Sequence, residues 1–231
     1  MDPSPVSAYE GLAPIYDYVM RHVDYQTWTD YIHQLLAPGQ AEALRLADLA
    51  CGTGNTTALF EDLGYQVVGI DGSAAMVDIA RQKAAERGSD THFYHCDLRQ
   101  LHGVPPCAAA VCLYDSFNYL LTPEDFAQAI ANVDQLLLPD STFVFDVCAG
   151  RKNRGHSEYD AEERLQYNHF RLRFDGCEEE FAETHTQRIY PLEQVIALAE
   201  ASPFELVDYF DDFTFERATE ESDRVHFVLR R

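Results

Sequence analysis

No stretch of this sequence approaches the roughly 18 consecutive apolar residues that a membrane-spanning helix requires. The first residues, Met1-Asp-Pro-Ser-Pro-Val, lack the basic region and apolar run that are typical of a secretory signal. We therefore expect a cytoplasmic protein with no membrane partner.

Basic residues are scarce. The chain has 17 Lys and Arg against 39 Asp and Glu, so its formal net charge is −22. Proteins that bind nucleic acids neutralise phosphates with Lys and Arg, and no basic cluster is visible here. This balance argues against nucleic acid or an anionic membrane surface as a partner, and the excess of acidic residues favours solubility.

Closely spaced cysteine pairs are also absent. The six cysteines form no C-x-x-C pair, and most of them fall inside apolar stretches. Structural zinc sites need paired ligands at short spacing, so we expect no metal. Reduced, partly buried thiols fit a cytoplasmic protein better.

Short apolar runs alternate with amphipathic stretches over residues 41–150. Strands are predicted at 46–50, 66–71, 91–97, 108–116 and 141–147, with helices between them. This order is typical of βαβ units and a parallel sheet covered on both faces. We therefore expect an α/β, doubly wound core over 41–150, preceded by an N-terminal helical cap over 1–40 that ends at Pro38-Gly39.

The pattern changes after Cys148. Alternation through Phe170, Leu172 and Phe174, a tight turn at Asp175-Gly176 and a return strand to Ile189 predict an antiparallel insertion over 151–190. A helix over 191–201 and strands over 204–210 and 224–230 then complete a mostly parallel, seven-stranded sheet. We expect the insertion to form a lid or a dimer contact, which makes a homodimer possible.

The first strand leads into a glycine turn, Leu46-Ala-Asp-Leu-Ala-Cys-Gly-Thr-Gly54. A strand, a glycine-rich turn and a helix together bring backbone close to a nucleotide cofactor. A dinucleotide fingerprint needs a third glycine, but the register here is Gly52-x-Gly54-x-x-Thr57. No Gly-Lys-Ser/Thr follows either, so neither a dinucleotide site nor a phosphate loop fits well.

Two aspartates follow the next strands at their carboxyl ends. Asp71 ends the second predicted strand, where an acidic residue can accept both ribose hydroxyls. Asp97 ends the third, where a carboxylate can receive an adenine amino group. Together with the turn, they predict an adenosine-containing ligand and favour S-adenosylmethionine over NAD.

Residues 46–147 resemble the core of class I, Rossmann-like S-adenosylmethionine-dependent methyltransferases. The resemblance rests on the glycine turn and on three further stretches, Val67-Val-Gly-Ile-Asp-Gly-Ser73, His95-Cys-Asp-Leu98 and Val111-Cys-Leu-Tyr-Asp-Ser-Phe-Asn-Tyr119. Within that class the chain is similar to glycine/sarcosine and deoxysugar-amine N-methyltransferases. That likeness rests on its tyrosine-rich first thirty residues and on Cys112–Asn118.

The resemblance implies a role for each matching position. Ala50, Cys51 and Gly52 of the turn would meet the methionine part of the cofactor through their backbone, and Asp71 would hold the ribose. Gly54 of the same turn is also an expected cofactor-binding residue. The remaining implied contacts are Gly72 and Met76 beside the ribose and adenine, Asp97 and the Leu98 amide on the adenine, Tyr114 near the sulfonium, and Tyr16 or Trp28 over the methionine end.

Methyl transfer from a sulfonium is an in-line displacement that depends mainly on positioning, so no catalytic triad is expected. Weak candidates around the acceptor are Tyr16, Asn118, His185 and Arg188. His185 and Arg188 would lie on opposite faces of one strand, and His185 as a general base is a hypothesis. Sequence leaves two alternatives to a methyltransferase acting on a small N- or O-acceptor (EC 2.1.1.-): a non-catalytic cofactor-binding protein and an NAD-dependent oxidoreductase.

Overall fold

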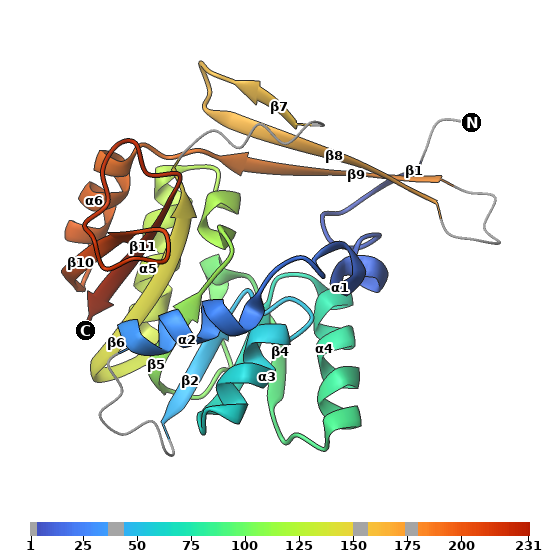
Figure 1. Ribbon diagram of the computed structural model, residues 1–231, viewed down its shortest axis with the longest axis horizontal. Coiled ribbons are helices and arrows are strands. Elements are labelled where there is room, and N and C mark those ends of the chain that lie inside the picture. The colour runs from blue at the N-terminus through green and yellow to red at the C-terminus, as the bar shows by residue number, and fades with distance from the viewer. Residues whose placement is uncertain (1–3, 37–43, 150–156, 174–179) are drawn as a thin grey trace.

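A computed structural model describes residues 4–36, 44–149, 157–173 and 180–231, and its large sheet has seven strands in the order β10-β11-β6-β5-β2-β3-β4 (Figure 1). The strands from β2 to β6 run parallel, whereas β11 is antiparallel to β6 and to β10. The predicted mostly parallel, seven-stranded α/β sheet is confirmed. Its strands are β2 (Arg45–Leu49), β3 (Gln66–Asp71), β4 (His92–His95), β5 (Cys107–Cys112), β6 (Leu137–Cys148), β10 (Glu205–Asp211) and β11 (Arg224–Arg230).

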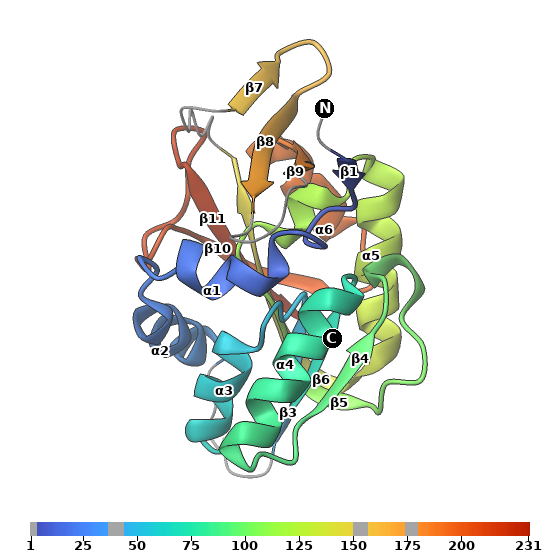
Figure 2. The same cartoon turned by 90° about the vertical axis from the view of Figure 1, so that its right-hand side faces the viewer.

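Helices cover both faces of this sheet, as Figure 2 shows from the side. Apolar side chains alternate between the two faces: Leu49 packs with the residues of α5 and α6, whereas Leu46 packs with those of α2 and α3. Burial on both faces explains why the central strands are almost continuously apolar. The helices are α1 (Tyr16–Val19), α2 (Tyr25–Leu35), α3 (Asn55–Asp62), α4 (Ala74–Arg87), α5 (Pro123–Leu136) and α6 (Leu192–Glu200), and the short 3-10 turns are η1 (Ala13–Ile15), η2 (Leu98–Gln100) and η3 (Ser116–Tyr119).

Helix α4 begins and ends at residues with the expected capping chemistry. The hydroxyl of Ser73 accepts from the Met76 amide at 3.4 Å, and Gly88 ends the helix in a left-handed conformation. Helix α5 begins in the same way at Thr122, with Pro123 in its first turn. None of the helices among the described residues has the length and apolar character needed to cross a membrane.

A second sheet, in the order β1-β9-β8-β7, lies across the end of the molecule at which the parallel strands finish (Figures 1 and 2). Its strands are β1 (Ser4–Val6), β7 (Ser157–Asp160), β8 (Leu165–Arg173) and β9 (Glu180–Arg188). The antiparallel β8–β9 pair confirms the predicted insertion, whereas the predicted turn at Asp175-Gly176 and the helix end at Pro38-Gly39 lie outside the described residues.

Two features of this part differ from the sequence prediction. The N-terminal segment is not helical throughout, because β1 pairs in parallel with β9 before η1 begins. The strand predicted at 108–116 ends at Cys112, because Tyr114 and Asp115 take left-handed φ angles of 62° and 53° and turn the chain into η3. As a result, the N-terminal segment and the residues that follow β5 both line the cavity described below.

Candidate functional site

A cavity of about 370 Å³ lies where β2, β3 and β5 end. In open α/β sheets, ligands bind in the crevice outside the carboxyl ends of the strands. The lining residues come from the chain after β2, β3, β4 and β5 and from the N-terminal segment. Sequence positions far apart along the chain therefore share one cavity.

The turn after β2 forms the floor of the cavity. Ala50, Gly52 and Gly54 take left-handed φ angles of 58°, 55° and 81°, and the Cys51 amide donates to the Ile70 carbonyl at 2.9 Å. Glycine adopts this conformation readily, whereas alanine at such an angle adds strain of about 1 kcal/mol. The turn thus keeps its backbone close to the space where a ligand would lie.

Asp71 connects the turn to the end of β3. One carboxylate oxygen accepts from the Gly52 amide at 2.8 Å, and the other accepts from the Ser73 amide at 2.8 Å. Burial raises the pKa of Asp71, although these two backbone hydrogen bonds act in the opposite direction. A carboxylate has about four lone-pair positions, so the two amides leave capacity for ligand hydroxyls.

Asp97 lies at the start of η2, directly after β4. Its carboxylate accepts from the backbone amide and side chain of Arg99, with the shortest contact at 2.6 Å from Nη2. The hydrogen bonds from Arg99 lower the pKa of Asp97, so the carboxylate stays ionised. Arg99 also faces Asp125 at 3.5 Å, and its charge is therefore shared between two carboxylates.

Asp48 also lines the cavity, and the sequence reasoning missed it. It lies inside β2 with 1% of its surface exposed, and it accepts from the hydroxyls of Thr56 at 3.0 Å and Thr57 at 2.6 Å. Burial raises its pKa to about 6. The available signal was a charged residue inside the otherwise apolar run Leu46-Ala-Asp-Leu-Ala50.

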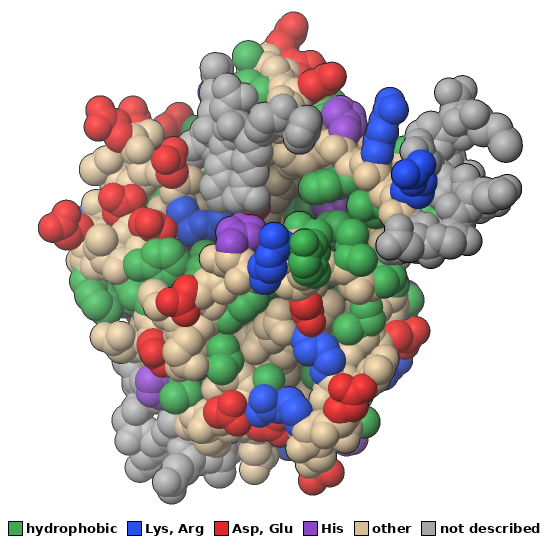
Figure 3. Space-filling model, turned by 45° about the vertical axis from the view of Figure 1, so that its right-hand side comes forward, with side chains coloured by type: hydrophobic (Ala, Val, Ile, Leu, Met, Phe, Trp, Pro, Cys, Tyr) green, Lys and Arg blue, Asp and Glu red, His purple; other side chains and the backbone are tan. Residues whose placement is uncertain are grey.

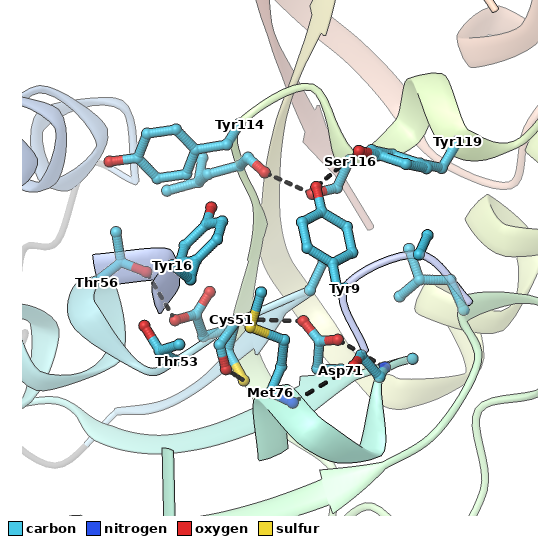
Figure 4. A pocket seen from close by; sticks show the side chains of 18 of the residues that line it. Tyr9, Tyr16, Cys51, Thr53, Thr56, Asp71, Met76, Tyr114, Ser116 and Tyr119 are labelled. Carbon is cyan, nitrogen blue, oxygen red and sulfur yellow. Dashed lines mark hydrogen bonds between the residues drawn. The ribbon is translucent and has the colours of Figure 1, made fainter. Parts of the chain in front are cut away.

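Five tyrosines line the open side of the cavity, and Figure 4 labels Tyr9, Tyr16, Tyr114 and Tyr119 around it. They are Tyr9, Tyr16, Tyr25, Tyr114 and Tyr119. Burial raises the pKa of each, so all five remain neutral phenols. The cavity thus combines a polar floor with aromatic walls.

The N-terminal segment is fixed over the cavity by a cluster around Asp17 of α1. The Asp17 carboxylate accepts from Lys83 Nζ at 2.7 Å, Thr53 Oγ1 at 2.6 Å and Asn55 Nδ2 at 3.0 Å. Lys83 belongs to α4, Thr53 to the turn itself and Asn55 to the start of α3. One carboxylate therefore links the cover to the floor.

Ten of the predicted cofactor-binding residues line the cavity. They are Tyr16, Ala50, Cys51, Gly52, Asp71, Gly72, Met76, Asp97, Leu98 and Tyr114.

Trp28 and Gly54 lie elsewhere. Trp28 stacks on Tyr114 with ring centroids 4.2 Å apart, and the Arg224 guanidinium lies 5.0 Å from its ring. The prediction that Trp28 closes over the ligand is therefore corrected: it supports Tyr114 from behind. Gly54 caps α3 and faces a separate hollow beside α4.

Two of the acceptor candidates are engaged in holding the backbone. The Asn118 side chain donates to the carbonyls of Cys148 at 2.9 Å and Arg188 at 2.7 Å and accepts from the Cys148 amide at 2.9 Å. Arg188 donates to the Leu121 carbonyl at 3.1 Å. Asn118 and Arg188 therefore fasten η3 to its neighbours, and neither lines the cavity.

His185 lies behind the cavity wall. It is 3% exposed, and its Nδ1 is 2.7 Å from the Tyr119 hydroxyl. Gln187, on the same face of β9, donates to the Asp115 carboxylate at 2.7 Å. The opposite orientation of His185 and Arg188 agrees with strand alternation.

The charges around the cavity discriminate between ligands. Its lining contains three carboxylates, Asp48, Asp71 and Asp97, and one cation, Arg99, which pairs with Asp97. On the face of the molecule drawn in Figure 3, hydrophobic side chains gather toward the middle of the view, and acidic side chains are spread toward its outline. Acidic and aromatic groups favour a cation and disfavour a pyrophosphate. The residues present therefore fit a sulfonium cofactor better than NAD.

Known proteins resemble this chain, two of them over 96% of its length. A family model described as a methyltransferase domain matches residues 46–140. The putative methyltransferase YqeM of Bacillus subtilis is 30% identical, covering 96% of this chain and 97% of its own. The glycine/sarcosine N-methyltransferase of Aphanothece halophytica is 30% identical over 45% of this chain and 40% of its own. A solved S-adenosylmethionine-dependent methyltransferase from Clostridium acetobutylicum has a TM-score of 0.80 at 23% identity, covering 96% and 98% of the two chains.

Proposed function

Because the chain belongs to the methyltransferase family, we propose that it transfers a methyl group from S-adenosylmethionine to the nitrogen or oxygen of a small molecule. The observation that carries this proposal is the acidic, aromatic cavity at the ends of the parallel strands. Its turn, its two strand-end carboxylates and its tyrosine cover all face one space.

Different cavity residues would contact different parts of the cofactor. Asp71 would accept from the ribose hydroxyls, and Asp97 from the adenine amino group, while Met76 supplies an apolar surface beside the adenine. The floor from Ala50 to Gly52 would meet the methionine end, together with Asp48 beneath it. When bound, S-adenosylmethionine supplies an electrophilic methyl group on a positively charged sulfur, and the departing thioether needs no proton.

The protein's own contribution is positioning and exclusion of water. Tyr9, Tyr16 and Tyr114 narrow the open side of the cavity, and aromatic faces attract the cationic methyl donor. Alignment of nucleophile and methyl group can supply about 7–11 kcal/mol of the barrier reduction. The cover held by Asp17 is therefore part of the catalytic arrangement.

A small molecule fits the acceptor side better than a polymer. The net charge of −22 disfavours nucleic acid, and the glycine/sarcosine N-methyltransferase relative supports an amine acceptor. Buried thiols such as Cys51 and Cys112 favour the reducing cytoplasm. The second sheet contacts the cavity lining through His185 of β9, which lies 2.7 Å from the Tyr119 hydroxyl. The part of this sheet in a homodimer stays a prediction for sedimentation analysis.

Calorimetry and a methyl-release assay test the proposal. We expect binding of S-adenosylmethionine and S-adenosylhomocysteine but not NAD, and Asp71→Asn should weaken this binding at least tenfold. Asp78→Asn, which changes an exposed aspartate on α4, is the matched control and should leave it unchanged. Tight NAD binding would instead favour an oxidoreductase. Cofactor binding without S-adenosylhomocysteine formation across amines, hydroxy compounds and carboxylates would favour a non-catalytic binding protein.

A further inference from the structure

Four side chains form a continuous hydrogen-bonded chain from a buried carboxylate to the cavity. Glu183 Oε1 is 2.5 Å from His185 Nε2, and His185 Nδ1 is 2.7 Å from the Tyr119 hydroxyl. The Tyr119 hydroxyl is in turn 2.7 Å from that of Tyr9. Figure 4 shows the last two hydroxyls meeting at the edge of the cavity. The chain joins β9, η3 and the N-terminal segment.

The carboxylate at the inner end is ionised. Glu183 is fully buried, and it accepts from the amides of Tyr9 at 2.6 Å, Gly11 at 2.9 Å and Leu12 at 3.0 Å. Burial opposes its ionisation, but the hydrogen bonds from His185 and from these amides prevail and lower the pKa of Glu183. A carboxylate that only accepts requires His185 Nε2 to carry the proton.

This requirement sets the direction of every other hydrogen bond in the chain. With Nε2 protonated, neutral His185 has a bare Nδ1, which accepts from the Tyr119 hydroxyl. Tyr119 has then used its only proton, so its oxygen accepts from the Tyr9 hydroxyl. Tyr9 in turn is left with lone pairs and no further proton to donate. Its oxygen can therefore accept a proton from a group inside the cavity.

The surroundings keep this arrangement in place. Tyr9 takes a left-handed φ of 65°, and its ring packs edge-on against the His185 ring at 4.4 Å. Phe170 of β8 covers another side of the imidazole at 5.1 Å. Burial raises the pKa of both tyrosines, so neither forms a phenolate and the protons must move together. The titratable groups facing His185 are Glu183, Tyr119 and Tyr9.

We propose that His185 takes the proton of the methyl acceptor through Tyr119 and Tyr9, an inference that rests on the proposed methyltransferase function. An acceptor that arrives as an ammonium or a hydroxyl gives its N–H or O–H proton to the Tyr9 oxygen, as the Tyr9 proton passes to Tyr119 and the Tyr119 proton passes to His185 Nδ1. Glu183 stabilises the imidazolium that results. The lone pair freed on the acceptor forms the new bond to the methyl carbon, while the bond between that carbon and the donor sulfur breaks and its electron pair stays on the sulfur.

This arrangement selects a class of substrate. A relay that removes a proton serves acceptors that carry a removable one on the reacting atom, namely amines that arrive as ammonium ions and hydroxyl groups. Thioethers have no such proton and gain nothing from the relay. Once His185 holds the transferred proton, Tyr9 presents a hydrogen-bond donor instead of a lone pair, so the relay must release that proton before it can accept another.

Nuclear magnetic resonance of ¹⁵N-histidine-labelled protein tests the direction of these hydrogen bonds and requires no methyl acceptor. His185→Gln identifies the signal of this ring. We expect a neutral ring protonated on Nε2 at the assay pH, and a shift of the Nδ1 signal in Tyr119→Phe. A ring protonated on Nδ1, or on both nitrogens, would overturn the proposal.

Kinetics of Tyr9→Phe and Tyr119→Phe test the proton transfer itself. With a protonated acceptor from an amino-acid and amino-sugar panel, each variant should lower kcat on the order of 100-fold while KM for the acceptor changes little. Tyr65→Phe is the matched control, because Tyr65 also bonds a histidine Nδ1, that of His33 at 2.9 Å, away from the cavity. An unchanged kcat in both relay variants, or a loss that appears only in KM, would refute the relay.

Cofactor binding separates this inference from the proposed function. Both tyrosine variants should bind S-adenosylmethionine with a Kd within about twofold of that of the parent protein. If the parent binds no S-adenosylmethionine, the proposed function fails. If it binds and methylates but the relay variants behave like Tyr65→Phe, only the relay fails.

Discussion

Replacing Asp48 by asparagine should stabilise the folded protein at neutral pH. The carboxylate is fully buried in β2, and its two hydrogen bonds from Thr56 and Thr57 do not compensate for its lost hydration. An asparagine oxygen can accept from the same two hydroxyls. The substitution therefore removes a buried charge while keeping its hydrogen bonds.

The pKa of Asp48 gives the magnitude. It rises from 3.8 to about 6 on folding, and each unit corresponds to about 1.4 kcal/mol. Because the folded pKa is the higher one, the favourable contribution is complete below pH 3.8 and is lost as pH rises through 6. Relative to a neutral side chain, the charge then destabilises the fold by about 1.5 kcal/mol at pH 5 and about 3 kcal/mol at pH 8.

Urea denaturation at pH 5, 6.5 and 8 checks this expectation. The free energy of unfolding of Asp48→Asn should exceed that of the parent at every pH, and the difference should grow toward pH 8. A gain that is absent, or that shrinks with rising pH, would refute the reasoning. Since Asp48 lines the cavity, we also expect the stabilised variant to bind S-adenosylmethionine more weakly in calorimetry.

Three further substitutions test other parts of the structure. Asn118→Ala removes three hydrogen bonds to backbone groups of Cys148 and Arg188 and should lower the free energy of unfolding in urea by about 3 kcal/mol, whereas a catalytic role alone would leave stability intact. Lys83→Ala breaks a half-exposed ion pair with Asp17, so it should cost under about 1 kcal/mol yet speed amide exchange over α1; unchanged exchange would contradict this. In Gly69→Ala the new Cβ would lie 2.4 Å from Phe93 Cδ1, so thermal unfolding should show a loss of about 1–3 kcal/mol; an unaltered Tm would mean that Phe93 moves freely.

Local patterns were enough to predict the elements of the core. Strand β3 and the capped helices α4 and α5 lie where apolar periodicity and the residues Ser73 and Thr122 placed them. The same reasoning put Asp71 and Asp97 at strand ends, and parallel strands bring such ends to one edge of the sheet. These inferences succeed because the information lies within a few residues along the chain.

Other positions needed the tertiary structure. Trp28 matches the pattern of a residue that closes over a ligand, yet stacking on Tyr114 places it behind the wall. The parallel pairing of β1 with β9 had no signal in the sequence, since three residues carry too little periodicity to identify a strand. It is this pairing that brings the chain near Tyr9 alongside Glu183.

The sequence by itself determined the alternating α/β core, the glycine turn and the acidic residues that follow its strands, because each is encoded in short-range spacing. Only the tertiary structure decided which side chains share the acceptor side of the cavity. Tyr9 lies 174 positions before Glu183, to which it donates its backbone amide. The hydrogen-bonded order of Tyr9, Tyr119, His185 and Glu183 depends on burial and on such amides from another segment. Residue spacing along the polypeptide specifies helices and strands. The protonation of buried polar groups, and which of them donates each hydrogen bond, are set by the residues that folding packs around them.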